Sequence, residues 1–463
     1  MIDRVKQFFS ATTILLLILV FAAGTRLWRL DFPHQYYFDE VYHVVTAKLM
    51  ARNNPAAYEW WHPAPEPNTA IDWLHPPLAK LMQAGSIAVL GDSSGVWRLS
   101  SALLGVGVIG LTYALARKLR FSPSVSVLAA GLASFDGLLL AMSRITMNDI
   151  HVTFFIVLTL WLYLHWREKP SWWRALLVGI SAGAAAASKW SGIFVVAPIA
   201  FDQVRLLMQS RIQHQKFQWG NSLWLWLSLI VGIPAMYLGS YGQMFLQGHS
   251  WDHFVQLHHQ IWWYQTNLTA THPYQSTPWE WLLDLRPVYT YTSNPGPSLM
   301  QHMYIQGNPL LLWAGLAAVL WTISSFIVWG GSWVQLALDT LGAKNKKNLT
   351  EIKKKFVLLQ KQTGAAESLL FLLVAYFSMW IVWTNSPRIM FFYHYTPALP
   401  FLFILLSYWL VKLWQHSLWG KYVSVSFIAL AFLTFILFFP NWTGLVMPQS
   451  PWSSLYFALP SWR

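Results

Sequence analysis

Long apolar stretches recur along the whole chain and constrain its fold more than any other sequence feature. Each is roughly 18 to 22 residues long, which as a helix crosses the hydrocarbon core of a bilayer, about 30 Å thick. Only 11% of the 463 residues are charged, whereas about 25% is usual in a soluble domain. We therefore predict an all-α polytopic membrane protein. The expected spans are residues 11–30, 96–116, 123–142, 148–166, 174–188, 191–208, 221–240, 309–330, 368–385, 395–414 and 422–440.

The distribution of basic residues predicts the orientation of these spans. A net charge of +13 is typical of many nucleic-acid-binding proteins. Here, however, most of the 31 Lys and Arg residues fall on one side of the membrane if the N-terminus is cytoplasmic, as the positive-inside rule requires. We therefore expect a cytoplasmic N-terminus, an extracytoplasmic C-terminus, a location in the cell (inner or plasma) membrane and no nucleic-acid partner. The first span lacks a small-residue cleavage site, so we expect it to be retained.

These spans predict a single integral membrane domain over residues 1–463. With the orientation given above, three long connecting segments are assigned to one side or the other. Two large outer loops, 31–95 and 241–308, are expected to carry short amphipathic helices. The basic segment 331–366 is expected inside, either as an amphipathic helix on anionic lipid or as a solvated linker. The chain has no cysteine, which excludes disulfides, thiolate catalysis and cysteine-ligated metals.

The first outer loop contains two candidate chemical motifs. Asp39 and Glu40 are adjacent carboxylates at a predicted helix start, where Asp39 can be an N-cap and Glu40 a favourable first-turn charge. Alternatively, one of them acts as a general base towards a hydroxyl. His75 precedes two prolines and Lys80, which places both residues where a loop meets a helix; a structural role is the commoner one there.

Further polar residues stand at the predicted outer ends of later spans. Arg144 and Asp149 can pair to close a tight hairpin, or Arg144 can bind an anion at the membrane surface. Lys189 can simply snorkel, and the aromatic residues near Arg286 can form an interfacial belt or line a cleft. The other candidates of this kind are His272, Trp279, Arg388 and His394.

Taken in order, six motifs resemble the protein O-mannosyltransferases, a family of GT-C membrane glycosyltransferases. They are FDE at 38–40, HPPLAK at 75–80, SRITMND at 143–149, SKWSG at 188–192, HPYQSTPW at 272–279 with RPV at 286–288, and SPRIMFFYHYTPALP at 386–400. The resemblance implies the GT-C fold, Asp39 as catalytic base, Glu40 helping to position the acceptor, and an outer cleft for lipid-phosphate mannose and a Ser/Thr polypeptide. Residues 241–308 are too short for the β-trefoil MIR module of eukaryotic members. The chain therefore looks like a bacterial member, for which a polyprenyl-phosphate donor is expected.

If the resemblance holds, a Ser or Thr hydroxyl attacks the anomeric carbon of mannosyl phosphate with inversion, and its proton passes to Asp39. The donor phosphate is then expected to be held by Arg144, as first choice, or by Lys189, Arg286 or Arg388. The remaining cleft residues would be His75, Lys80, Asp149, His272, Trp279 and His394. No metal or other cofactor is expected.

Two alternatives stay open from sequence. A related GT-C enzyme that modifies a lipid or glycan would share the fold and donor class. A transporter is less favoured, because its polar residues would lie near mid-span rather than in outer loops.

Overall fold

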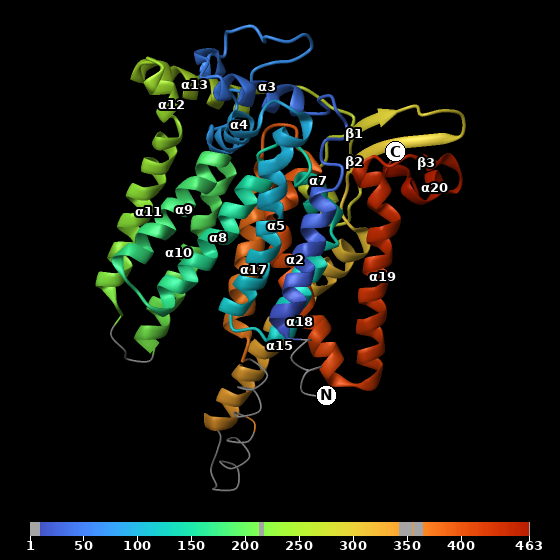
Figure 1. Ribbon diagram of the computed structural model, residues 1–463. Helices are drawn as coiled ribbons and strands as arrows, with labels where there is room; N and C mark the ends of the chain where they lie inside the picture. Colours follow the sequence, from blue (N-terminus) through green and yellow to red (C-terminus); the bar gives the residue numbers. More distant parts are fainter. Residues whose placement is uncertain (1–9, 213–216, 342–354, 356–363, 463) are drawn as a thin grey trace.

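The computed structural model describes residues 10–212, 217–341, 355 and 364–462, and its described part is predominantly helical. Long helices run side by side through the body of the molecule (Figure 1). They are α2 (Ala11–Leu27), α5 (Ser94–Lys118), α6 (Pro123–Ser134), α8 (Asp149–Glu168), α9 (Trp172–Ser188), α10 (Val196–Ile212), α11 (Trp219–Ser240), α15 (Pro309–Leu341), α17 (Ala366–Trp380), α18 (Leu399–His416) and α19 (Leu418–Thr443).

Every predicted span coincides with one of these helices, and the chain is a multi-pass membrane protein. Eight helical segments of the described chain are long and apolar enough to cross a bilayer. Three predicted spans correspond to shorter helices, namely α2, α9, and α6 continued by α7 (Gly137–Met142). The number of eleven spans therefore stays a prediction.

Close helix packing depends on glycine between α9 and α11. A Cβ added at Gly179 would lie 2.0 Å from the carbonyl oxygen of Ser228, and one at Gly183 would lie 2.6 Å from Cβ of Met236. No larger residue fits at such an approach. Small residues at helix interfaces are the usual basis of helix association in membranes, where lipid supplies no hydrophobic driving force.

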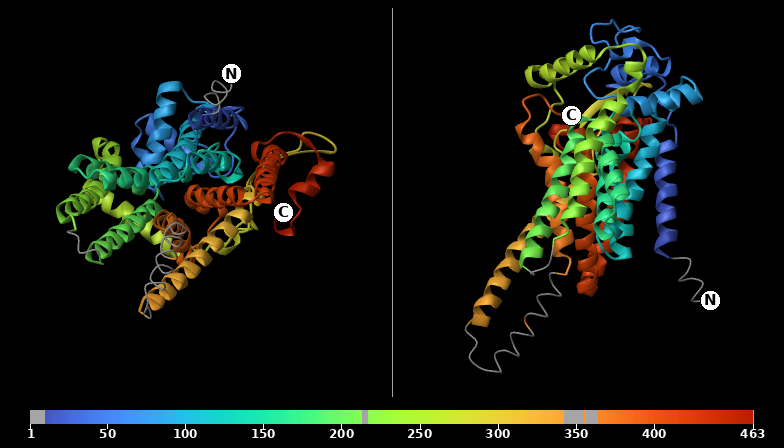
Figure 2. Two further views of the ribbon diagram at one scale, coloured as in Figure 1. Left: turned by 90° about the horizontal axis from the view of Figure 1, so that it is seen from below. Right: turned by 90° about the vertical axis from the view of Figure 1, so that its left-hand side faces the viewer.

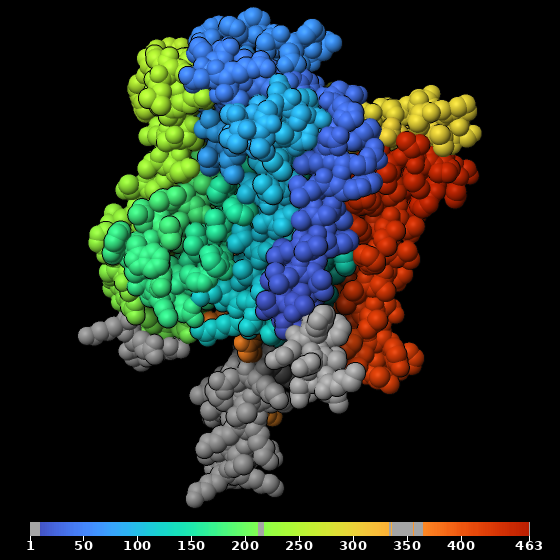
Figure 3. All heavy atoms as spheres, in the orientation of Figure 1, coloured from blue at the N-terminus to red at the C-terminus, as the bar shows by residue number. Residues whose placement is uncertain are grey.

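The short elements of the predicted outer loops gather at one end of the bundle, away from the described start of the chain at residue 10 (Figures 1 and 2). In the space-filling view, the first-loop elements and those after α11 form a continuous cap over that end (Figure 3). The cap comprises α3 (Glu40–Ala51), η1 (Pro55–Tyr58), α4 (Leu78–Leu90), α12 (Gly242–Leu246) and α13 (Trp251–Asn267). Helix α14 (Pro278–Trp281) contacts the segments Ile381–Asn385 and Phe392–Ala398.

A small antiparallel sheet departs from the all-helical expectation. Strands β1 (Val288–Ser293) and β2 (Leu299–Ile305) form a hairpin, and β3 (Met447–Pro448) pairs with β2 before α20 (Gln449–Tyr456) and η5 (Pro460–Trp462). Alternating β-branched and aromatic residues in β1, followed by the turn residues Asn294, Pro295 and Gly296, favour such a hairpin. The sequence therefore indicated a hairpin here, but the all-α prediction, made from the apolar spans, did not include it.

Helix α15 continues beyond its predicted span, which ended at residue 330, as far as Leu341. Most of the basic segment 331–366 lies outside the described residues. The choice between an amphipathic helix and a solvated linker therefore stays open.

Candidate active site

Six segments that are far apart in sequence line one pocket of about 330 Å³ beneath the cap, and one of them is the end of α13 with Tyr264 and Leu268. The start of α3 contributes Asp39, and the segment before α4 contributes His75. Asp149 comes from the start of α8, Lys189 from the end of α9 and Arg388 from the loop before α18. Together with His394, which also lines the pocket, the structure therefore brings together six of the residues that the sequence singled out.

Asp39 occupies the N-cap position of α3, but its side chain makes no capping hydrogen bond. Its carboxylate has no hydrogen-bond or ion-pair partner among the residues that the structure describes. Burial raises the pKa of Asp39 to about 6, an effect reinforced by the charges of Asp72 and Asp149 and opposed by His43 and Lys189. The backbone position of Asp39 therefore agrees with the N-cap interpretation. Its side chain does not cap the helix and instead lines the pocket.

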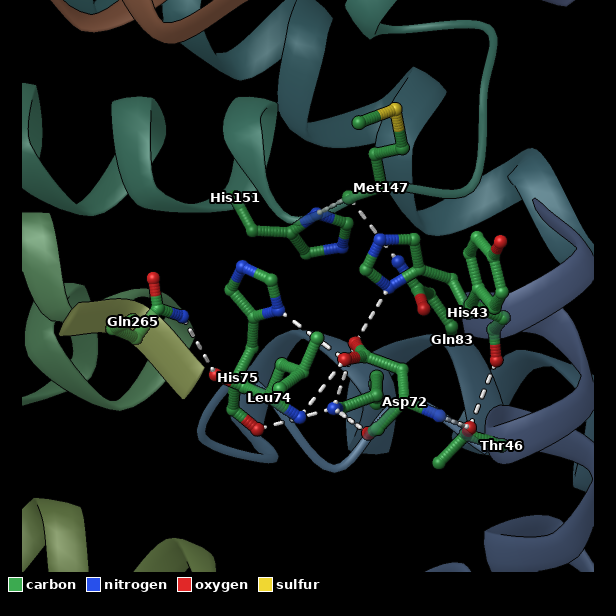
Figure 4. Close-up of polar contacts among 11 residues, drawn as sticks. His43, Thr46, Asp72, Leu74, His75, Gln83, Met147, His151 and Gln265 are labelled. Carbon is green, nitrogen blue, oxygen red and sulfur yellow. Dashed lines mark hydrogen bonds and ion pairs between the residues drawn. The ribbon is translucent and has the colours of Figure 1, made fainter. Parts of the chain in front are cut away.

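Asp72 lines the same pocket and is the centre of a cluster of polar contacts (Figure 4). Its Oδ2 accepts a hydrogen bond from Lys80 Nζ at 2.9 Å, and the same nitrogen donates to two backbone carbonyls. Nδ1 of His75 lies 3.2 Å from Oδ1, and Nδ1 of His43 lies 3.0 Å from Oδ2. Burial opposes ionisation, but Lys80, His75 and His43 together hold the pKa of Asp72 well below its usual value.

Sequence reasoning missed Asp72 and His43 as site residues. Asp72 is three residues before His75, just ahead of the HPPLAK motif, so the short spacing was an available signal. His43 is one helical turn after Asp39, which places both side chains on one face of α3. Lys80 lies behind Asp72 and is not among the pocket-lining residues.

Glu40 is fully buried and lies outside the pocket. Its two carboxylate oxygens accept hydrogen bonds from Nε and Nη2 of Arg98, both at 2.8 Å. Oε1 also accepts from the backbone N–H of Thr146 at 3.0 Å. Glu40 therefore joins the start of α3 to α5 and to the 143–148 loop, and it can influence an acceptor only by positioning Asp39.

Two cations stand at the boundary between this pocket and a neighbouring one. Lys189 Nζ forms an ion pair with Asp149 Oδ1 at 2.7 Å, and Arg388 donates a hydrogen bond to Gln265. Both side chains line both pockets, as do His75 and His394. The second pocket, of about 370 Å³, has mainly apolar walls that include Trp190, Ile193, Phe194, Trp262 and Trp383. An anionic group attached to an apolar chain fits this junction.

Arg144 does not reach either pocket, which corrects its place as first choice for the donor phosphate. Its Nη1 donates to the carbonyls of Thr25, Arg26 and Trp28 at 2.7–3.0 Å, and Nη2 donates to that of Arg29 at 3.1 Å. These are carbonyls at the C-terminal end of α2, which have no partner within the helix. The alternative interpretation, an Arg144–Asp149 pair, does not hold either, because Asp149 pairs with Lys189.

Arg286 and Trp279 are exposed and line neither pocket. Arg286 lies 3.7 Å from the carboxylate of Glu280, and its Nη1 donates to the carbonyl of Pro273 at 3.3 Å. The Trp279 ring packs against Trp380 with centroids 4.9 Å apart. His272 does not line the site pocket. Its ring packs against the ring of Phe391, a pocket-lining residue, with centroids 5.2 Å apart.

The bundle and its capped pocket define a class, the polytopic membrane proteins with a GT-C-like fold. The structure superposes on that of the Saccharomyces cerevisiae protein O-mannosyltransferase Pmt1-Pmt2 complex bound to the sugar donor with a TM-score of 0.71. That match has 15% identity and covers 94% of this chain and 90% of that one. ArnT from Cupriavidus metallidurans bound to undecaprenyl phosphate matches with a TM-score of 0.52 and 16% identity, over 91% of this chain and 64% of that one.

Family models match nearly all of the chain from residue 76 onwards. Residues 76–246 match the dolichyl-phosphate-mannose-protein mannosyltransferase family, and residues 250–462 match the C-terminal four-transmembrane region of protein O-mannosyltransferase. The chain belongs to the protein O-mannosyltransferase family, and the resemblance inferred from its motifs is confirmed.

Relatives in two bacteria carry the name polyprenol-phosphate-mannose–protein mannosyltransferase. The protein from Corynebacterium glutamicum is 25% identical, over 92% of this chain and 88% of its own. The protein from Mycobacterium tuberculosis strain H37Rv is 24% identical, over 84% of this chain and 81% of its own.

Proposed function

We propose that this chain transfers mannose, with inversion, from a polyprenyl-phosphate carrier to Ser and Thr hydroxyls of polypeptides. The observation that carries the proposal is the unpaired carboxylate of Asp39, which shares a pocket with Lys189 and Arg388. A general base and an anion-binding pair are the two components that the reaction needs. The names of the bacterial relatives support mannose as the sugar and a polyprenyl chain as the carrier.

In the proposed reaction, the acceptor oxygen attacks the anomeric carbon while the bond from that carbon to the phosphate oxygen breaks. The hydroxyl proton passes to Asp39, and the electron pair of the broken bond stays with the leaving lipid phosphate. Lys189 and Arg388 stabilise the charge that develops on that phosphate. Holding the reactants together in this geometry lowers the barrier further, because the acceptor no longer has to find the donor by diffusion.

The carrier lipid would extend from the phosphate into the apolar pocket. Trp190, Ile193 and Phe194 belong to the helical segment at residues 190–211, which is long and apolar enough to span a membrane. A lipid tail in this pocket would therefore lead towards the bilayer without leaving apolar surroundings. His75 and His394 stand between the two pockets, where the mannosyl group would lie.

We place the active site on the extracytoplasmic face of the cell membrane, within one integral membrane domain. The charge distribution supports this sidedness, because the predicted outer loops carry few basic residues and the opposite loops carry most of them. Clustering of those outer loops at one end of the bundle agrees with the same parity (Figure 1).

The proposal is tested with the full chain in proteoliposomes, supplied with polyprenyl-phosphate mannose labelled in the sugar and with an unstructured Ser/Thr peptide. Label should enter the peptide in alkali-labile linkage. Label that enters only lipid or glycan would favour the related glycosyltransferase, and label that crosses the membrane without transfer would favour a transporter. Either result would contradict protein mannosylation.

A further inference from the structure

A continuous row of aromatic rings leads from the site pocket to the β-hairpin. Tyr393 and Phe391 line the pocket that holds Asp39, and their rings stack at 5.5 Å. From Phe391 the row continues to His272, Tyr274 and Tyr289 of β1. The centroids of successive rings are 5.2, 5.9 and 5.8 Å apart. These five residues are called the aromatic row below.

The outer part of the aromatic row is accessible, and the hairpin beside it carries no charged side chain; Arg286, which donates to the carbonyl of Pro273, is a charged residue next to the row. His272, Tyr274 and Tyr289 are only half-buried. The hairpin, residues 288–305, contains no Asp, Glu, Lys or Arg. It projects from the side of the helical body, where its surface is open (Figure 3). The hairpin surface favours an uncharged ligand with flat or compact side chains, because it has no charged side chain with which to form an ion pair.

Strand β1 adds a second, independent feature, because one of its edges is free. In the order β1-β2-β3 it is an outer strand, and its only strand partner within the described chain is β2. Its backbone makes no other hydrogen bond to the main chain of a described residue. A free edge of this kind can accept an extended peptide as an additional strand, which a sugar or lipid cannot provide.

From these observations we infer that the aromatic row and the free edge of β1 form the docking track for the acceptor polypeptide on one side of the modified Ser or Thr. The inference rests on the proposed function, whose hydroxyl acceptor it identifies as an extended, uncharged segment. Four ring-to-ring steps separate Tyr393 from Tyr289. At about 3.3 Å per residue for an extended chain, the track accommodates on the order of six residues.

Three peptides that share one target threonine test the inference with the full-length protein. The first has about four residues, and the other two carry uncharged extensions of about six residues on the N-terminal or the C-terminal side. With the unaltered protein, one extension but not the other should lower KM, by roughly tenfold. Methylation of alternate backbone nitrogens in that extension should abolish the gain, because it removes the donors that pair with β1.

Tyr274→Ala and Tyr289→Ala should each raise KM for the favoured long peptide by about fivefold to tenfold. They should leave kcat, and transfer to the short peptide, nearly unchanged. The phenylalanine variants keep the ring and should behave like the unaltered protein. Trp61→Ala removes an exposed aromatic ring elsewhere in the cap and serves as the matched control.

Equal KM values for all three peptides would overturn the docking track while leaving the proposed function intact. An equal effect of the tyrosine variants on short and long peptides would also overturn it, and would instead indicate an interfacial belt that supports the fold. Failure of the proposed function is distinguishable from both outcomes, because in that case no peptide would be modified.

Discussion

Asp39 must be ionised to accept a proton, so its pKa governs the acid limb of the pH profile. Burial raises that pKa to about 6. Activity should therefore be present above this pH and fall as the pH decreases through it, about two units above the range of an ordinary aspartate. The measurement is kcat/KM against pH, which reports the ionisation of the free enzyme.

His43→Gln provides a control on this assignment. His43 opposes the rise of the Asp39 pKa, so its removal should move the acid limb to higher pH. An acid limb near pH 4 in the unaltered protein would contradict the raised pKa of Asp39.

Arg388 is expected to hold the donor phosphate rather than the fold. Arg388→Ala should raise KM for polyprenyl-phosphate mannose by about tenfold to a hundredfold, as expected for the loss of a charge-assisted hydrogen bond. Arg388→Lys keeps the charge but lacks the planar fork, so it should recover donor use only in part. Unchanged donor KM in both variants, measured at saturating peptide, would exclude Arg388 from the phosphate site.

At the scale of secondary-structure elements, Arg144 fixes the C-terminal end of α2 to the loop before α8. Arg144→Ala leaves several carbonyls of that end without a protein donor and should lower the free energy of unfolding by about 2–4 kcal/mol. Donor KM of the folded variant should stay normal. Thermal unfolding in detergent measures the first quantity, and a normal Tm combined with weakened donor binding would restore Arg144 to the phosphate site.

The contrast between Arg144 and Asp39 shows what sequence could predict at this scale. Helices were predictable because apolar length and composition report directly on burial in a bilayer. The place of Asp39 in the pocket was predictable because it belongs to a short motif of a recognisable family. The partners of Arg144 are backbone carbonyls of a helix more than a hundred residues away, and backbone atoms leave no trace in sequence.

The ion-pair partner of Asp149 was also hard to predict, because it depends on how distant helices pack. Sequence proximity favoured Arg144 as the partner of Asp149, whereas packing of α8 against α9 places Lys189 there. Asp72 could have been found, since it lies within three residues of His75. Its contact with His43 depends on how α3 lies against the segment before α4.

For the whole molecule, the proposed sidedness predicts where inserted tags are exposed. A tag between Asn294 and Ser298, in the turn of the β-hairpin, should be labelled by an impermeant reagent in intact cells or spheroplasts. A matched tag between Lys169 and Pro170, in the predicted cytoplasmic turn after α8, should be labelled only after permeabilisation. The reverse pattern would contradict the positive-inside assignment and place the active site in the cytoplasm.

The proposed function depends on transfer at the Asp39 pocket, and one comparison tests that most directly. Unaltered protein and Asp39→Asn are reconstituted with labelled polyprenyl-phosphate mannose and a Ser/Thr peptide, and both donor binding and label in the peptide are measured. Asparagine keeps the shape of aspartate but cannot accept the proton, so donor binding should persist while transfer falls by at least about a hundredfold. An asparagine variant that retains most of its transfer activity would show that Asp39 is not the base.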